Sequence, residues 1–538
     1  MKGAVSLSAA ALVTALWTGG ALAHEENSAA LGQVHFPTSC AGSVQPVFER
    51  GVALLHSFWY EEALKTFTSV TTTDPGCAMG YWGQAMSVYY PLWQPPSEAM
   101  LTKGRAALDK AATLTATPRE KDYVAALATF YRDSDKLDHR TRAVAYEKAM
   151  EQLAARYPED REASVFYALA LDATALPTDK TYANQLKAAA ILEKVYAEQP
   201  NHPGVAHYLI HSYDSAPLAT RSLTAARSYS KIAPAVPHAL HMPSHIFTRV
   251  GYWQESIDSN LASAEAGKAY VAKQGGGYAW DQTLHAQDYL VYSYLQTGRD
   301  GAARRVVQEM AEYRKAEPES LAAAYALVAV PARYALERRN WNEAAAITMP
   351  AITFSWARYP WAEAIIVYTH ALGSARTGNV AAAEKDVERL AALRDALTQA
   401  KNTYWADQVE VQRRAAAAFV ARAKGNAGES LALLRSAADL ETSMDKHPVT
   451  PAAVVPAREL LGDVLLEMNR PAEALKEFEL TLVGEPNRFR TLYGAGHAAE
   501  RSGDVARAKT FYTSAVNLCG SADTERPELR AAKAFLAK

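Results

Sequence analysis

The sequence predicts an all-α protein, and three observations indicate this fold class. The 538-residue chain is rich in alanine, and 49% of its residues are hydrophobic. Runs of β-branched residues are few. A spacing of small residues, an aromatic residue and a proline recurs along most of the chain, as in a repeat array. The formal net charge of -2 provides no basic surface, so we expect no nucleic-acid partner.

The N-terminal region has the pattern of a secretory signal. Residues 1–23 combine the basic residue Lys2, an apolar stretch and a small-x-small cleavage site at Ala21 to Ala23. The mature chain is then expected to begin near His24, with a polar leader at residues 24–45. Later segments are too polar to span a membrane. The sequence therefore predicts a periplasmic or secreted protein with no membrane span after signal cleavage.

Small residues, an aromatic residue and a proline recur at fixed spacing from about residue 47. Glycine and alanine let two helices approach closely, the aromatic side chain fills the gap, and proline ends the second helix. The clearest copies are Gly51, Ala63, Phe67 and Pro75; Gly462, Ala474, Phe478 and Pro486; and Gly496, Gly503, Ala508 and Tyr512. This pattern resembles the tetratricopeptide repeat (TPR), which pairs two antiparallel helices. The resemblance implies a TPR-like α-solenoid of stacked antiparallel helix pairs.

Two stretches interrupt the repeat pattern. Residues 444–456 contain three prolines and predict a break between a TPR-like array at 46–443 and a C-terminal TPR pair and tail at 457–538. Residues 266–278 contain three consecutive glycines and predict an irregular connection inside the array. This connection falls within a histidine-rich segment, residues 201–292.

Half of the histidines lie in this segment. Seven of the fourteen occur there: His202, His207, His211, His238, His241, His245 and His285. His207 and His211 are four residues apart, as are His241 and His245. Residues three or four apart share one face of a helix, so separate helices each present imidazoles along one stripe.

The TPR resemblance implies that the first helices of successive units line a concave groove. Counting from the repeat landmarks Pro200, Gly251 and Gly298 places three polar stripes at positions that face this groove. Packed helices lie about 8–10 Å apart, which lets imidazoles from both sides share a metal ion. We predict as ligands His207, His211, His238, His241, His245 and His285, with Asp214, Asp288 and Arg249 as supporting residues.

Two histidine motifs also resemble those of a group of exported bacterial TPR proteins. The first is His202-Pro203-Gly204 followed by His207 and His211, and the second is the run from Pro237 to Ile246 that contains His-Met-Pro-Ser-His. The block from His56 to Ala63 belongs to the same resemblance. It implies one architecture over the mature chain and implies no reaction.

Nitrogen ligation suits a transition metal such as Zn, Cu or Fe. Three hypotheses stay open. The first is a periplasmic TPR scaffold whose groove binds a protein, a peptide or a small ligand beside a histidine-bound metal. The second is a metal-dependent hydrolase or oxidase, since histidines at this spacing on facing helices also occur in paired-copper oxidase sites. The third is a metal-free interaction module.

Three further features are left open by the sequence. His56 faces inward in the first unit and is a secondary ligand candidate, whereas His202 precedes a proline at a helix start and is expected to be structural. Cys40 and Cys77 flank the first helix pair and are able to meet, but unpaired thiols fit the spacing equally well.

Overall fold

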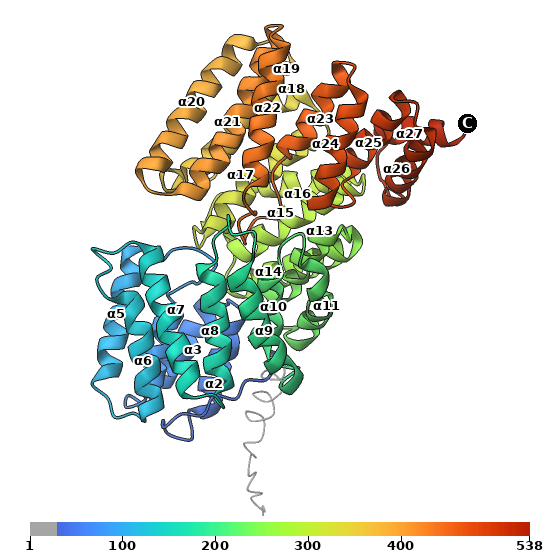
Figure 1. Cartoon of the computed structure of the whole chain (residues 1–538). Coiled ribbons are helices and arrows are strands. Elements are labelled where there is room, and N and C mark those ends of the chain that lie inside the picture. Colours follow the sequence, from blue (N-terminus) through green and yellow to red (C-terminus); the bar gives the residue numbers. More distant parts are fainter. Residues whose placement is uncertain (1–29) are drawn as a thin grey trace, which may run out of the picture.

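The computed structural model describes residues 30–538, so the expected signal peptide and the first residues of the polar leader lie outside the described part. The chain forms an all-α solenoid of consecutive antiparallel helices (Figure 1). Among the described residues, none of the helices combines the length and apolarity that crossing a membrane requires.

The N-terminal helices form the lower part of the molecule in Figure 1, drawn in blue and teal. They are α2 (Gln45–His56), α3 (Tyr60–Thr73), α4 (Ala78–Met86), α5 (Glu98–Ala112), α6 (Pro118–Tyr131), α7 (His139–Arg156), α8 (Arg161–Thr174) and α9 (Ala183–Glu198).

Helices of less even length follow and lead into the middle of the molecule. They are α10 (Pro203–Ser212), η1 (Ala219–Ser222), α11 (Leu223–Ile232), α12 (Pro237–His241), α13 (Pro243–Val250), α14 (Trp253–Lys273), α15 (Asp281–Gln296), α16 (Asp300–Glu312), α17 (Leu321–Glu337) and α18 (Trp341–Ala345). Two short strands, β1 (Ala279–Trp280) and β2 (Ala316–Glu317), pair in parallel.

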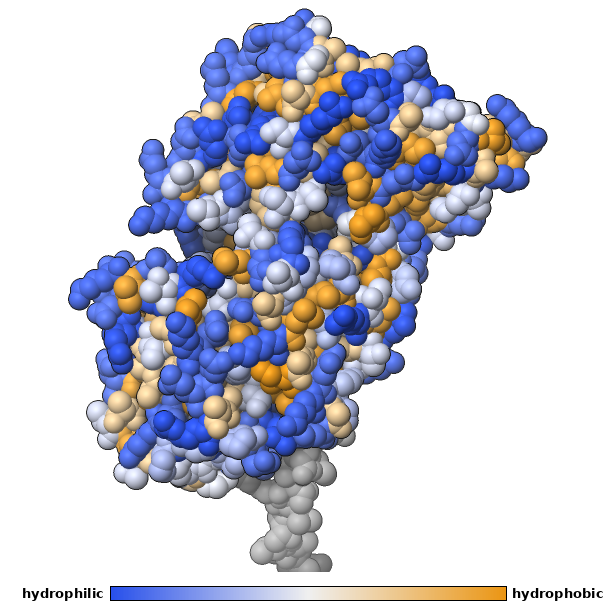
Figure 2. Space-filling view, viewed as in Figure 1, coloured by the Kyte–Doolittle hydropathy of each residue, from blue (hydrophilic) through white to orange (hydrophobic). Residues whose placement is uncertain are grey.

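The C-terminal helices form the upper part of the molecule, in orange and red. They are η2 (Trp356–Arg358), α19 (Pro360–Arg376), α20 (Val380–Gln399), α21 (Thr403–Ala423), α22 (Ala427–Thr442), α23 (Ala457–Glu467), α24 (Pro471–Gly484), α25 (Phe489–Arg501), α26 (Val505–Leu518) and α27 (Pro527–Leu536). Figure 2 shows the surface hollowed between the lower and upper parts.

Glycines of one helix pack against aromatic rings of the next, as the repeat pattern requires. A Cβ atom added at Gly51 would lie 2.8 Å from the Phe67 ring, and one at Gly83 would lie 2.3 Å from the same ring. Gly462 and Gly494 flank Phe478 in the same way, at 2.7 and 2.5 Å. Each aromatic ring therefore joins three consecutive helices, because it fills the space that two glycines leave open.

The two interruptions of the repeat differ in structure. The connection expected at residues 266–278 is wrong for most of its length, because α14 continues to Lys273 and only residues 274–278 lie outside the helix, including the glycines at 275–277, all with positive φ. Between Thr442 and Ala457 the chain is not helical and runs back to the central helices. There the carbonyl of Thr450 accepts a hydrogen bond from the Tyr289 hydroxyl at 3.0 Å.

The start of the described chain is attached to the helices. Cys40 and Cys77 form a disulfide, and Cys519 is buried and free. The Glu120 carboxylate accepts hydrogen bonds from both the amide and the hydroxyl of Ser39 at 2.6 Å. Phe36 is fully buried and packs edge-on against Phe48. The polar leader thus contributes to the core of the first repeats.

Replacing Gly494 by alanine should destabilise the C-terminal repeats. The new methyl group would meet the Phe478 ring at 2.5 Å, and overpacking of this kind costs about 1–3 kcal/mol. The measurement is the midpoint of thermal unfolding. Gly428→Ala is the matched control, because Gly428 lies in α22 with nothing within 4 Å of an added Cβ. Equal midpoints for the two variants would contradict this account of the glycines.

Candidate metal centre

Prolines determine where the histidine helices begin. Pro203, Pro237 and Pro243 open α10, α12 and α13, where a missing amide hydrogen costs nothing. Pro243 also divides the expected helical run, since Met242 is a turn between α12 and α13. Met242 keeps helical dihedral angles (φ -53°, ψ -34°). His241 and His245 therefore remain on one face despite the break.

The six predicted histidines form two groups of three. The first trio is His207, His211 and His238, and the second trio is His241, His245 and His285; within each trio one nitrogen per ring lies within 4.8 Å of the others. The trios are in contact, with ring centroids 5.8 Å apart for His211 and His245 and 5.9 Å apart for His238 and His241. Four helices, α10, α12, α13 and α15, thus bring six imidazoles to one place, rather than to the single shared ion that the sequence suggested.

Hydrogen bonds on the outer ring nitrogens fix how these imidazoles are turned. His207 Nδ1 donates to the carbonyl of His56 at 2.6 Å. His241 Nδ1 donates to Asn260 Oδ1 at 2.6 Å, and the Asn260 amide nitrogen is directed away by its bond to the Ser256 carbonyl. His245 Nδ1 donates to Asp214 at 3.0 Å. In these three neutral rings the hydrogen therefore sits on Nδ1, and Nε2 carries a lone pair.

These Nε2 atoms converge. His241 and His245 place theirs 3.0 Å apart, and His207 Nε2 lies 3.1 Å from His211 Nε2 and 3.2 Å from His238 Nε2. The lone pairs of His241 and His245 repel each other at this separation unless a cation lies between them. His285 adds a buried Nε2 atom that has no hydrogen-bond partner. The inner nitrogens therefore provide the donor set that a metal ion needs.

Burial keeps the six rings unprotonated. It lowers the pKa of His211 to about 3 and that of His241 to about 4, and it lowers the pKa of the other four well below the ordinary value. Neighbouring histidines lower the pKa of most of them further by charge repulsion. Neutral imidazole is the form that ligates metals.

Aromatic side chains from distant parts of the chain enclose the trios. Phe58 stacks on His211 and His238, with centroids 5.7 and 5.6 Å apart. The edge of Trp93 meets both His238 and His285. Packing on several sides limits ring rotation, so the donor atoms are preorganised.

The predicted supporting residues have different positions. Asp214 bonds to His245, and Arg249 donates to Asp214 at 2.9 Å, so both support the second trio. Asp288 instead forms a buried ion pair with Arg333 of α17, and no described contact joins it to the six histidines. Asp288 lies three residues after His285, which placed it on the same helix face, but the position of α17 gives the Asp288 carboxylate Arg333 as its partner.

The other two histidines also have assigned roles. His56 and His202 both bond to the buried carboxylate of Glu162, at 2.8 and 2.9 Å. Burial lowers the pKa of His56 despite this carboxylate. The second ring nitrogens are also bonded, to the Tyr208 hydroxyl and the Val205 amide. This set is thus fully hydrogen-bonded, and His56 serves the centre through its carbonyl group rather than its ring.

Sequence reasoning missed several residues that contact the centre. Asn260 and Gln282 bind outer ring nitrogens, Gln282 at 3.0 Å from His238 Nδ1. Lys446, from the non-helical segment, donates to Asp214 at 2.6 Å. Phe58 lies in the block from His56 to Ala63 that carries the family resemblance, and this block is the only sequence signal for it. Asn260, Gln282 and Lys446 have no such signal in the sequence, because their contacts join residues far apart in the chain.

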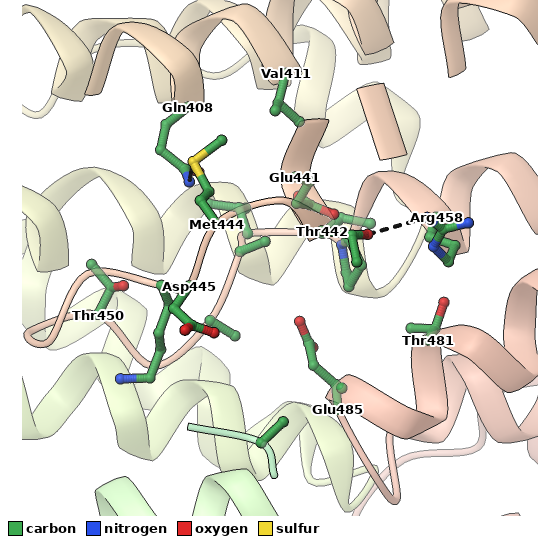
Figure 3. A pocket seen from close by; sticks show the side chains of 18 of the residues that line it. Gln408, Val411, Glu441, Thr442, Met444, Asp445, Thr450, Arg458, Thr481 and Glu485 are labelled. Atoms are coloured by element: carbon green, nitrogen blue, oxygen red, sulfur yellow. Dashed lines mark hydrogen bonds between the residues drawn. The ribbon is translucent and has the colours of Figure 1, made fainter. Parts of the chain in front are cut away.

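Two cavities flank the segment between α22 and α23. The metal-side cavity, about 290 Å³, is lined by His211, the one ligand candidate that is not fully buried, together with Asp172 and Lys446. The junction cavity, about 490 Å³, is lined by Trp405, Glu441 and Glu485. Figure 3 shows Glu441 and Glu485 entering the junction cavity from different helical ends, beside Met444 and Thr450 of the segment.

This chain matches no protein-family model and no curated protein sequence. Among solved structures, a human IFIT1 dimer with m7Gppp-AAAA is 12% identical, with 92% of this chain and 94% of that chain covered and a TM-score of 0.37. A monomeric IFIT1 mutant with the same RNA is 12% identical, with 82% of this chain and 90% of that chain covered and a TM-score of 0.35. A chain of a Naa15/Naa10 complex bound to HypK-THB is 11% identical, with 91% of this chain and 73% of that chain covered and a TM-score of 0.20. Similarity at this level identifies neither a ligand nor an activity for this chain.

Glu441 should make stability fall as the pH rises. Burial raises its pKa to about 8, from 4.5, so between these values the folded protein holds a proton that the unfolded chain releases. The free energy of unfolding then falls by at most about 1.4 kcal/mol per pH unit in that window. In urea unfolding, Glu441→Gln should match the unmodified protein near pH 4.5 and exceed it at pH 8. A constant difference across this range would contradict the assignment.

Proposed function

We propose that the protein is an exported, ligand-binding helical-repeat metalloprotein that holds two transition-metal ions, one in each histidine trio. The observation that carries the proposal is the set of converging Nε2 atoms, together with the hydrogen bonds that already occupy the outer nitrogens of His207, His238, His241 and His245. Three protein ligands per ion leave coordination positions open, as in metal sites that bind exogenous molecules. The Cys40–Cys77 disulfide supports an oxidising, extracytoplasmic location.

Copper is the metal that we propose. Both trios offer neutral imidazole nitrogens alone, which suit copper better than the hard cations that take carboxylate oxygens. A copper pair would supply one-electron steps and dioxygen binding, so we infer an oxidase activity. The residues of this chain would hold the ions, exclude water with Phe58 and Trp93, and admit a ligand on the side of His211.

Metal stoichiometry tests this proposal. Elemental analysis of the protein loaded with copper should give two ions per chain. His207→Ala and His241→Ala should each lose about one ion, because they remove ligands from different trios. His370→Ala is the control, since His370 bonds to Asp386 in α20 and belongs to neither trio. One ion or none in the unmodified protein would contradict the proposal.

Oxygen uptake separates the oxidase from a hydrolase. With ascorbate as reductant, the copper-loaded protein should consume dioxygen faster than the zinc-loaded protein and faster than the His207→Ala variant. Two tightly bound zinc ions without oxygen uptake by the copper form would favour the hydrolytic alternative.

Asn260 should control metal affinity without contacting the metal. Its amide oxygen fixes the Nδ1 hydrogen of His241, and loss of such a partner lowers metal affinity about 10- to 100-fold. Asn260→Ala should therefore release copper to a competing chelator at lower chelator concentration. Asn184→Ala, which removes an amide that bonds to Leu171 and Thr174, is the control. Equal release curves would show that the outer hydrogen bond is unimportant.

A further inference from the structure

Residues that line the metal-side cavity carry buried polar atoms that lack hydrogen-bond partners. Asp172 of α8 is 7% exposed and Ser215 is 5% exposed, and both line this cavity beside His211. Asp172 Oδ1, Ser215 Oγ and Gln185 Oε1 are buried without a partner. Buried polar groups are almost always hydrogen-bonded, and leaving one unmatched is costly. Three residues of one cavity lining that each carry an unmatched polar atom point to a ligand that bonds to them.

Charge narrows the class of that ligand. Asp214 and Asp445 also line the cavity, but Asp214 is paired with Lys446 and Asp445 with Lys180. None of the salt bridges among the described residues involves Asp172, whose bonded partner is the Ser212 hydroxyl. Burial correspondingly raises the pKa of this carboxyl well above its ordinary value. A positively charged ligand would supply the missing partner.

Position and shape add two further constraints. The second oxygen of Asp172 accepts a hydrogen bond from Ser212 at 2.8 Å, and Ser212 follows His211 in α10. The Asp172 carboxyl is therefore bonded to the helix that carries His211. Aromatic side chains form another part of the lining, and they suit an apolar or aromatic body: Tyr90, Trp93 and Tyr404.

We propose that the metal-side cavity binds a small primary amine, with its ammonium group bonded to the wall of Asp172, Gln185 and Ser215 and its apolar body against the aromatic lining. An ammonium group has three donors and no acceptor, which matches a carboxylate, an amide oxygen and a hydroxyl oxygen. An alcohol has one donor and no charge, so it satisfies fewer of these atoms. The inference names the ligand class of the proposed metal centre and rests on that centre only for placing the amine beside His211.

Calorimetric titration of the zinc-loaded protein tests the inference without redox turnover. The probes are 2-phenylethylamine and 2-phenylethanol, which differ in the ammonium and hydroxyl groups. We expect the amine to bind at least about tenfold more tightly than the alcohol, as hydrogen bonds to charged groups imply. Equal affinities, or no amine binding, would overturn the inference.

Variants then locate the amine. Asp172→Asn should weaken amine binding at least about tenfold and leave alcohol binding unchanged. Glu441→Gln removes a carboxyl from the junction cavity instead and should leave both unchanged. Ser215→Ala, which loses one unpartnered hydroxyl, provides a second test should Asp172→Asn fail to fold. Amine binding that survives both Asp172→Asn and Ser215→Ala would overturn the inference.

Metal content, measured on the same samples, separates the two proposals. Two ions with no amine binding would reject the amine alone. Amine binding that depends on Asp172, in a protein that holds no metal, would reject the metal centre and retain the ligand class. Loss of both metal binding and amine binding would reject both proposals.

Discussion

Buried imidazoles with inward-facing lone pairs are the constraint on which the rest of this structure depends. Four of the six uncharged rings have acceptors for their outer nitrogens, and a cation in each trio, as proposed above, would offset the repulsion between the inner nitrogens. The acceptors come from the His56 carbonyl, Asn260, Gln282 and Asp214. Without these partners the rings would rotate to relieve the repulsion, and the centre would not keep its form.

The repeat architecture supplies the rigidity that such a centre needs. Phe67 and Phe478 each occupy space left by two glycines, so neighbouring helices cannot slide without opening a void. The same packing leaves α10, α12, α13 and α15 shorter or more buried than the helices at either end, with polar side chains facing inward. The middle of this solenoid therefore has a buried polar interior at the place where an ordinary solenoid has a solvated groove.

The segment between α22 and α23 joins the upper part of the molecule to the centre. Lys446 reaches Asp214, and the carbonyls of Thr450 and Ala452 accept hydrogen bonds from Tyr289 and Tyr325. The segment also separates the two cavities, since Lys446 lines both. The proline-rich break between repeats therefore covers the histidine trios and shapes the space in front of them.

The sequence by itself determined the helix pairs and the histidine stripes, because glycine, aromatic and proline spacings act within one or two adjacent helices. It also indicated the ligand candidates, since residues four apart share a helix face whatever the surroundings. It did not determine that the six rings divide into two trios, that Asp288 turns to Arg333, or that Asn260, Gln282, Phe58 and Lys446 surround the centre. Those outcomes depend on contacts between residues far apart in the chain, and only the tertiary packing of the solenoid decides which distant side chain reaches which ring.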